Sequence, residues 1–166
     1  VESSPLIMDL VGDEQLEIVF ADYTGMVYMV NAQGESIDNP VLPFDAGGQV
    51  WSSPAAADLD LDGNIEIVIT SKNKHLYILD PVEGIVQAEM NAGQFLMGTP
   101  AIGNMDDDEE LEVVVGGYKT SGKIFAVNPD GSDVAGFPLE LNEKILRGIS
   151  LADFDDNDRM DMVCVT

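Results

Sequence analysis

Four nine-residue windows of the 166-residue chain hold most of its acidic side chains. They contain nineteen of the 31 Asp and Glu residues within 36 positions, over residues 9–17, 58–66, 104–112 and 153–161. Carboxylates packed this closely repel one another unless a cation lies among them. The chemistry that these windows offer is therefore the binding of a positive ion.

The second window has the ligand spacing of a calcium loop. Three Asp residues stand at positions 1, 3 and 5, and alternate residues of a tightly wound loop point inward. Gly63 at position 6 permits the positive φ that turns the chain back. Hard oxygen donors in a flexible cage favour Ca²⁺ over Zn²⁺. The expected ligands are Asp58, Asp60, Asp62, the backbone carbonyl of Asn64, and Glu66.

The third and fourth windows keep the same ligand positions, so the sequence predicts two to three Ca²⁺ ions in all. At position 6, Asp158 tolerates the left-handed conformation, whereas Glu109 is less comfortable there. The expected ligands of the third window are Asn104, Asp106, Asp108, the Glu110 carbonyl and Glu112. Those of the fourth are Asp153, Asp155, Asn157, the Arg159 carbonyl and Asp161.

The first window is the weakest of the four. Val11 stands where the position-3 ligand should be, and Asp9, Asp13 and Glu17 remain. We expect weak metal binding there or none. For every window the alternative is an acidic, solvated turn that is capped by Asx hydrogen bonds. An EF-hand is excluded because apolar residues and Cys164 occupy position 12 and because both flanks have strand patterns.

The windows recur with periods of 49, 46 and 49 residues, and their flanks recur with them. A Ser-Pro or Thr-Pro precedes the first three windows, an Ile/Val run follows each window, and a strand with a central aromatic residue comes next in the first three. In the second unit the predicted strands after the window are Ile65–Thr70, Leu76–Leu79 and Ile85–Met90. Four short strands per repeat of this length are typical of a β-propeller blade.

The predicted fold is therefore all-β, a partial β-propeller of about three and a half four-stranded blades of 46–49 residues. Residues 1–166 form one propeller segment, with repeats over about 1–49, 50–96 and 97–145 and an incomplete one over 146–166. Three and a half blades do not close a ring. We expect the chain, which begins at Val1, to be a piece of a longer propeller, with a ring completed by a second copy as the alternative.

Composition excludes several partners. The formal charge is −24, with 7 Lys and Arg, so no basic face for nucleic acid or for an anionic membrane is expected. No apolar run approaches the length of a membrane span, which predicts no membrane insertion. The apolar fraction is 45%, typical of a globular chain, and the single cysteine forms no intrachain disulfide.

The sequence SSPAAADLDLDGNIEIVIT, followed by HLYILD, resembles the FG-GAP (VCBS-type) repeat of integrin-like β-propellers. The resemblance covers essentially the whole chain, but Ser/Thr-Pro replaces the FG-GAP dipeptides, which favours a bacterial-type variant. It implies a calcium-stabilised propeller of roughly six to eight blades. It also implies a protein that is extracellular, on the cell surface or periplasmic, and that binds a protein or glycan ligand there.

No catalytic constellation is visible in the sequence. His75 is expected on a surface strand and Cys164 in a buried strand, where apolar and acidic neighbours raise a thiol pKa. Trp51 has a packing role or, alternatively, forms a platform for sugars. The basic residues show no gathering at one mouth of the ring; they are Lys72, Lys74, Lys119, Lys123, Lys144, Arg147 and Arg159.

The functional hypothesis is a non-enzymatic, Ca²⁺-stabilised propeller module of a secreted or cell-surface protein, which mediates adhesion or interaction with a protein or glycan. The alternative is the propeller of a secreted enzyme, such as a polysaccharide lyase or a phytase-like protein. In that case the abundant carboxylates would act on an extracellular substrate.

Overall fold

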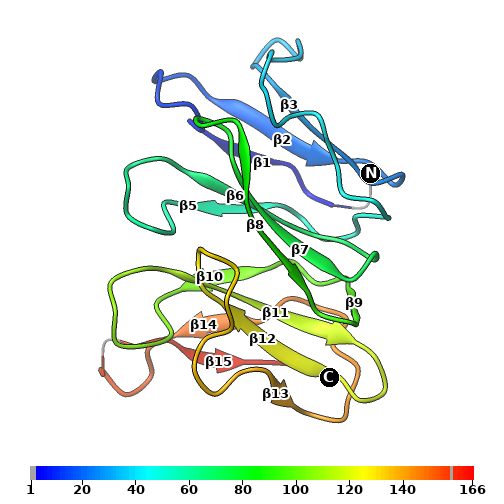
Figure 1. Ribbon diagram of the computed structural model, residues 1–166, viewed down its shortest axis with the longest axis vertical. Coiled ribbons are helices and arrows are strands. Elements are labelled where there is room, and N and C mark those ends of the chain that lie inside the picture. The colour runs from blue at the N-terminus through cyan, green and yellow to red at the C-terminus, as the bar shows by residue number, and fades with distance from the viewer. Residues whose placement is uncertain (1–2, 158) are drawn as a thin grey trace.

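The computed structural model describes residues 3–157 and 159–166, which form an all-β fold without a helix (Figure 1). Antiparallel pairing arranges these strands into four sheets. The first contains β1 (Leu6–Met8), β2 (Glu17–Ala21), β3 (Met26–Val30) and β4 (Phe44–Asp45). The second contains β5 (Ala55–Ala57), β6 (Glu66–Thr70), β7 (His75–Asp80) and β8 (Ile85–Asn91).

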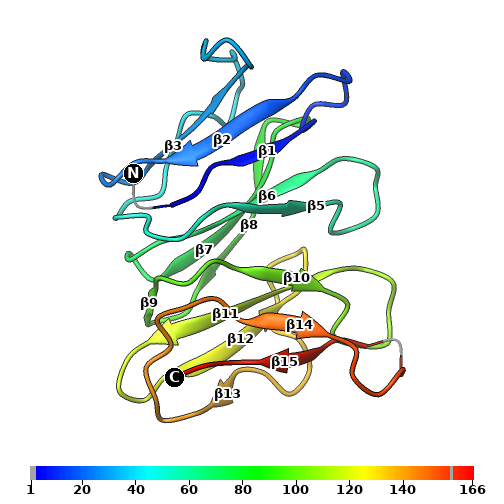
Figure 2. The same ribbon diagram turned by 180° about the vertical axis from the view of Figure 1, so that it is seen from behind.

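The third sheet contains β10 (Ala101–Gly103), β11 (Glu112–Tyr118), β12 (Lys123–Val127) and β13 (Leu139–Glu140), and β9 (Phe95–Leu96) pairs with the end of β11. The fourth contains β14 (Ser150–Ala152) and β15 (Asp161–Val163). Figure 2 shows the first strands of the sheets in a row, and β10 contacts both β5 and β14. Stacked four-stranded sheets of this kind confirm the predicted partial propeller.

The apolar core lies between the sheets. All five residues of β6 are buried, as are the first six of β11, because each strand packs against a sheet on either side. In contrast, β2 in the first sheet alternates between buried and half-buried residues, and β15 is mostly exposed. The Ile/Val runs are therefore apolar on both faces only where two neighbouring sheets cover them.

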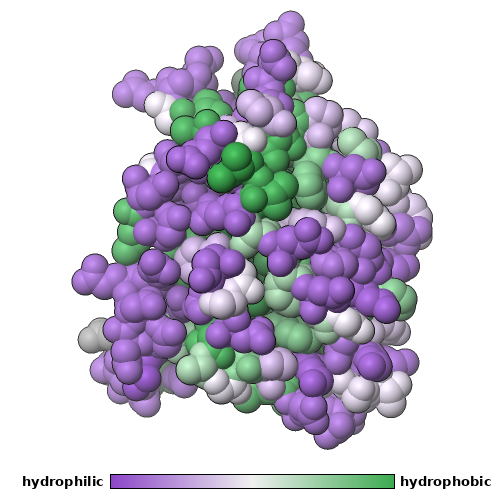
Figure 3. Space-filling model, in the orientation of Figure 1, coloured by the Kyte–Doolittle hydropathy of each residue, from purple (hydrophilic) through white to green (hydrophobic). Residues whose placement is uncertain are grey.

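The acidic loops and the hairpin turns lie at opposite ends of the sheets. In Figure 1 the loops β1–β2, β5–β6, β10–β11 and β14–β15 project to the left, and the turns β2–β3, β6–β7 and β11–β12 lie to the right. Figure 3 shows hydrophilic side chains along the side from which the loops project. The acidic loops therefore lie at one end of the sheets, and the hairpin turns lie at the other.

The fourth strands of the first and third sheets are shorter than the repeat predicts. Only two residues each form β4 and β13, whereas β8 has seven. Pro43 immediately precedes β4 and Pro138 immediately precedes β13, and a proline has no N–H to donate to a neighbouring strand. No helix long and apolar enough to cross a membrane occurs in the described part of the chain.

Candidate metal centres

All four acidic loops are closed by the same hydrogen bond. The acidic residue at position 9, which begins the second strand of the sheet, accepts a hydrogen bond from the backbone N–H at position 2. This contact holds the two ends of the loop together across the first strand pair. The pairs are Leu10–Glu17 (2.8 Å), Leu59–Glu66 (2.7 Å), Met105–Glu112 and Phe154–Asp161 (3.0 Å).

The second loop brings its three Asp carboxylates together. One oxygen from each of Asp58, Asp60 and Asp62 lies within 4.8 Å of the others. Gly63 has a φ of 96°, as its place in the loop predicts, and its N–H donates to Asp58 (3.1 Å). The Asn64 N–H donates to Asp62 (2.7 Å). The loop therefore presents a convergent cluster of negative oxygens of the kind that Ca²⁺ binds.

Three carboxylate oxygens at these loops are buried and make no hydrogen bond among the described residues: Asp58 Oδ1, Glu66 Oε1 and Glu112 Oε1. Glu66 and Glu112 are fully buried, and the other oxygen of each accepts the loop-closing bond. A buried carboxylate oxygen without a partner is costly. A cation at the loop would remove that cost, so these oxygens fit a metal.

Burial raises the pKa of both glutamates. The pKa of Glu66 rises to about 7, chiefly through loss of solvent and further through the carboxylates of Asp60 and Asp62. The pKa of Glu112 also rises to about 7, for the same reason and through the neighbouring Asp106. Backbone hydrogen bonds oppose both shifts but do not cancel them. Without a cation, these two carboxyl groups therefore stay protonated to a higher pH than an ordinary glutamate does.

The third loop gathers Asp106, Asp108 and Glu112, which offer one oxygen each within 4.8 Å of one another. The Asn104 side chain stays within this loop, where its amide nitrogen donates to the carbonyl of Asp108 and its oxygen accepts from the N–H of Asp106. The Glu110 N–H donates to Asp108 (3.0 Å). Residues 104–112 contain no positive φ, so Glu109 avoids the conformation that its position would demand in the second loop.

The fourth loop gathers Asp153, Asp155 and Asp161 in the same way. The Asn157 side chain accepts from the N–H of Arg159 (2.9 Å), whose guanidinium lies 3.3 Å from Asp107 of the third loop. Asp161 is exposed, unlike its equivalents in the other loops. Asp158, expected to carry the turn at position 6, lies outside the described residues.

In the first loop, the carboxylate at position 1 is hydrogen-bonded to the backbone of its own loop. Asp9 accepts hydrogen bonds from the backbone N–H groups of Gly12 (2.8 Å), Asp13 (3.2 Å) and Glu14 (2.9 Å). This is the self-capped acidic turn that was the alternative for all four windows. Glu17 closes the loop, as its equivalents do in the others.

Two residues at the second loop were not predicted as part of it. Asp80, at the end of β7, is buried and accepts a hydrogen bond from the Asn64 side chain (3.4 Å), and its charge also raises the pKa of Glu66. Gln87, on β8, donates to Asp60 (2.9 Å). The acidic end of HLYILD, where the first and third units have Asn, is the sequence signal that could have indicated Asp80.

His75 and Cys164 show no catalytic arrangement in the described part of the chain. His75 is half-buried, stacks on Tyr77 and lies 3.6 Å from Glu89. Cys164 is half-buried, and burial raises the pKa of its thiol as expected. Trp51 is also half-buried and stacks on Tyr23 at 6.0 Å between ring centroids.

No protein-family model matches the chain, and no curated protein sequence matches it. Solved structures do. The C-terminal domain of Pseudomonas aeruginosa PilY1 is 18% identical, with a TM-score of 0.65, over 90% of this chain and 36% of that one. BBS1N, solved in complex with ARL6, is 16% identical, with a TM-score of 0.62, over 96% of this chain and 45% of that one.

The V. cholerae biofilm matrix protein Bap1 is 19% identical to the chain, with a TM-score of 0.53, over 96% of this chain and 34% of that one. The chain thus spans about a third to a half of the length of these structures. All three similarities are to β-propeller-like domains. At such low identity these similarities establish only the fold, which is propeller-like. They do not establish the function, because proteins of one fold can have unrelated functions.

Proposed function

We propose that the chain is a segment of a calcium-stabilised β-propeller of the FG-GAP (VCBS) type. Ca²⁺ binds at the second and third loops and, with a more exposed ligand set, at the fourth. Carboxylates supply most of the ligands, and the Asn64, Glu110 and Arg159 carbonyls complete the shells. The ions hold each β-hairpin loop in the shape that joins the first two strands of its sheet.

The buried, unpaired oxygens of Asp58, Glu66 and Glu112 carry this proposal. A solvated acidic turn would leave its carboxylates in water, and one closed by Asx bonds would satisfy them with backbone N–H groups, as Asp9 does in the first loop. Neither alternative accounts for the buried oxygen of Glu66 and of Glu112 that has no hydrogen-bond partner among the described residues. A cation does, because it pairs with the buried oxygens and neutralises the surrounding carboxylates.

We further propose that the segment belongs to a secreted or cell-surface protein and acts as a binding module in adhesion. Extracellular calcium modules have dissociation constants on the order of 10⁻⁴–10⁻³ M, which extracellular calcium can fill. Similarity to a biofilm matrix protein, and to a domain solved with a partner protein, supports an interaction role. The outer edge of β15 has no described partner strand, and further strands of a longer propeller would pair with it.

Thermal unfolding with Ca²⁺ and with EDTA tests the proposal. At calcium concentrations 100 times the dissociation constant, one site stabilises the folded state by about 2.7 kcal/mol. For a chain of this size that corresponds to a melting temperature higher by roughly 5–10 °C. The Asp58→Asn variant should show a smaller rise, because it removes a ligand charge from the second loop.

The matched control is Asp9→Asn, the same substitution at the same position of the first loop. It should leave the calcium-dependent rise unchanged, whatever it does to the metal-free protein. Equal melting temperatures with Ca²⁺ and with EDTA in the wild-type chain would contradict calcium binding.

A further inference from the structure

The basic residues gather at one end of the propeller, contrary to the expectation from sequence. Lys72 and Lys74 lie in the turn between β6 and β7, and Lys119 lies in the turn between β11 and β12. Lys123 begins β12, and residues 141–149, which carry Lys144 and Arg147, cross the same end through backbone bonds to Gly122 and Gly117. Six of the seven cations are thus opposite the acidic loops.

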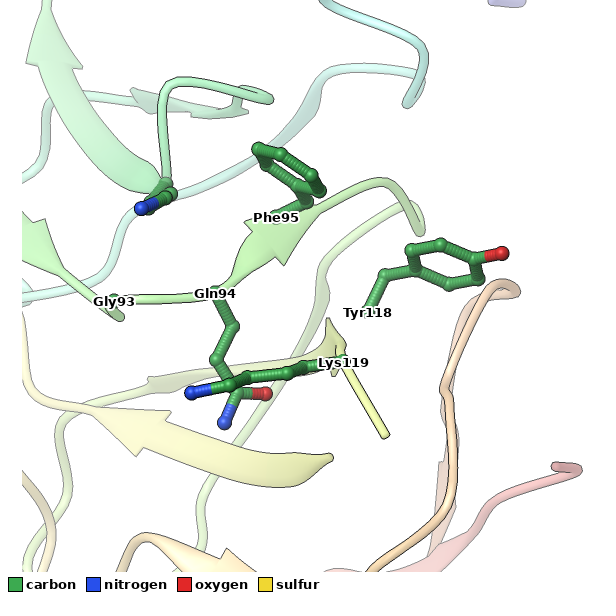
Figure 4. Close-up of a pocket in the computed structure, with 6 residues that line it drawn as sticks. Gly93, Gln94, Phe95, Tyr118 and Lys119 are labelled. Carbon is green, nitrogen blue, oxygen red and sulfur yellow. The ribbon is translucent and has the colours of Figure 1, made fainter. Parts of the chain in front are cut away.

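A pocket opens among these turns, with a volume of about 250 Å³. Its walls come from two adjacent sheets (Figure 4). Gln94 is buried beneath it and immobilised, because its amide donates to the Ser121 carbonyl (3.0 Å) and accepts from the Lys123 N–H (3.3 Å). The lining residues are Lys74, Gly93, Gln94, Phe95, Tyr118 and Lys119.

Aromatic rings and ammonium groups lie close together at this pocket. The Lys74 ammonium lies 6.0 Å from the centre of the Phe95 ring, and Lys144 lies 5.3 Å from the centre of the Tyr118 ring. Phe95 is 42% exposed, so part of its ring is open to solvent beside the Lys74 ammonium. Figure 4 shows the Phe95 and Tyr118 rings on the same side of Gln94, with the Lys119 side chain extending away from them.

The two lysines that line the pocket, and Lys144 beside it over the Tyr118 ring, are free to pair with a ligand. Acidic side chains at the same end of the sheets are Asp22, Asp45, Glu89, Glu140 and Glu143. Glu89 faces His75, and Glu140 pairs with Lys123 (3.0 Å). Among the described residues no carboxylate lies within 4.0 Å of the Lys74, Lys119 or Lys144 ammonium groups.

We propose that this pocket binds a uronic-acid residue of an acidic polysaccharide. A uronate ring has an apolar C–H face, which can pack on an exposed aromatic ring, and a carboxylate at its edge, which the lysines can pair with. The inference rests on the proposed role as a binding module and names the class of its ligand. It does not depend on a metal, because the pocket lies at the opposite end from the acidic loops.

The distance of the acidic loops and the small number of lysines restrict the kind of anion that the pocket can bind. Salt screens charges beyond about 8 Å at physiological ionic strength, so the distant acidic loops repel a bound uronate weakly. A nucleic acid presents a continuous row of phosphates and requires many cations along its path. The two lysines that line the pocket, with Lys144 beside it, suit a single carboxylate instead. An acidic peptide lacks the flat apolar face that the Phe95 and Tyr118 rings would cover.

Titration calorimetry of the calcium-loaded 166-residue chain with a galacturonate trisaccharide tests the proposal. Binding is expected, with little or none for the neutral methyl ester of the same trisaccharide. The Lys74→Ala/Lys119→Ala variant should bind roughly tenfold more weakly, because it removes two exposed ion pairs, each of which contributes modestly to binding. Phe95→Leu should also weaken binding, since it keeps an apolar side chain but removes the ring, and Phe95→Tyr should restore it.

The matched control is Lys123→Ala, which removes one cation at the same end but outside the pocket and should bind the trisaccharide as the wild type does. Preference for a poly-glutamate peptide or for an oligonucleotide over the trisaccharide would overturn the proposal. So would loss of binding in Asp58→Asn with binding retained in the lysine variant, because the uronate would then bind at calcium. A chain that calcium stabilises but that binds no uronate would refute this inference alone.

Discussion

At the scale of single residues, the glutamate at position 9 has two roles that compete for one carboxylate. In Glu66 and Glu112 one oxygen accepts the loop-closing hydrogen bond, and the other is buried without a described partner. Burial raises the pKa of each to about 7. If calcium binds as we propose, protons and calcium compete for the same oxygens near neutral pH.

This competition predicts opposite pH responses with and without metal. The folded-state pKa of about 7 lies above the unfolded value of about 4.3, so the folded chain holds the extra protons between these values. The stability they contribute is complete below about pH 4.3 and is lost as the pH rises through about 7. In EDTA the melting temperature should fall between pH 6 and 8, while the affinity for Ca²⁺ should rise.

Glu66→Gln identifies the titrating group. Glutamine stays neutral and can keep the bond to the Leu59 N–H. The melting temperature of this variant should therefore fall less between pH 6 and 8 than that of the wild type, and the fall that remains is the part that Glu112 contributes. Calorimetry in buffers of different ionisation enthalpy should show proton release on calcium binding near pH 6.5. A wild-type melting temperature that is constant from pH 6 to 8 in EDTA would contradict the buried-glutamate account.

At the scale of elements, glycines let neighbouring sheets and linkers approach the central strands. Gly116 lies in β11, and a methyl group there would overlap Cγ2 and Cβ of Ile145, a fully buried residue of the segment that follows β13. Gly122 likewise faces the backbone of Glu143. The close passage of residues 141–149 over the third sheet, which carries Lys144 to the pocket, depends on this lack of side chains.

Gly116→Ala should destabilise the chain by about 1–3 kcal/mol, since overpacking moves a β-branched side chain or the strand itself. Urea unfolding measures this change in free energy. Gly103→Ala is the matched control, because a methyl group there first meets the flexible, partly exposed side chain of Met160. Equal losses in the two variants would show that the packing against Ile145 is not the cause.

At the scale of the whole molecule, burial varies from sheet to sheet. The strand β6 is buried and paired on both sides, whereas β15 has one described partner strand and exposed side chains. The second and third sheets form the interior of the segment, and the first and fourth are its ends. Local opening should therefore be easiest in the fourth sheet.

Hydrogen exchange followed by mass spectrometry should show this order, with β6 slowest and β15 fast. Calcium should slow exchange in residues 58–66 and 104–112, where its ligands lie. Residues 9–17 provide the internal control, because Val11 replaces a ligand and Asp9 is already bonded to the backbone. Equal slowing in residues 9–17 would show that calcium acts on the chain as a whole.

The sequence by itself was enough to predict the period, the strand order and the grouping of most of the acidic side chains in the loops. These features are local. Position 9 meets position 2 across one hairpin, and Asp58, Asp60 and Asp62 are brought together by a turn of a few residues. Strand type followed from β-branched runs and proline positions, although the shortening of β4 and β13 was not foreseen.

The tertiary structure alone decided which side chains from separate strands and from different repeats meet. Asp80 reaches the second loop from β7, and Lys74, Phe95 and Tyr118 converge from segments of two sheets. The salt bridge from Arg159 to Asp107 likewise joins the fourth loop to the third. Linear spacing specifies contacts within a hairpin, whereas contacts between blades depend on how the sheets stack and on the side chains that fill the space between them.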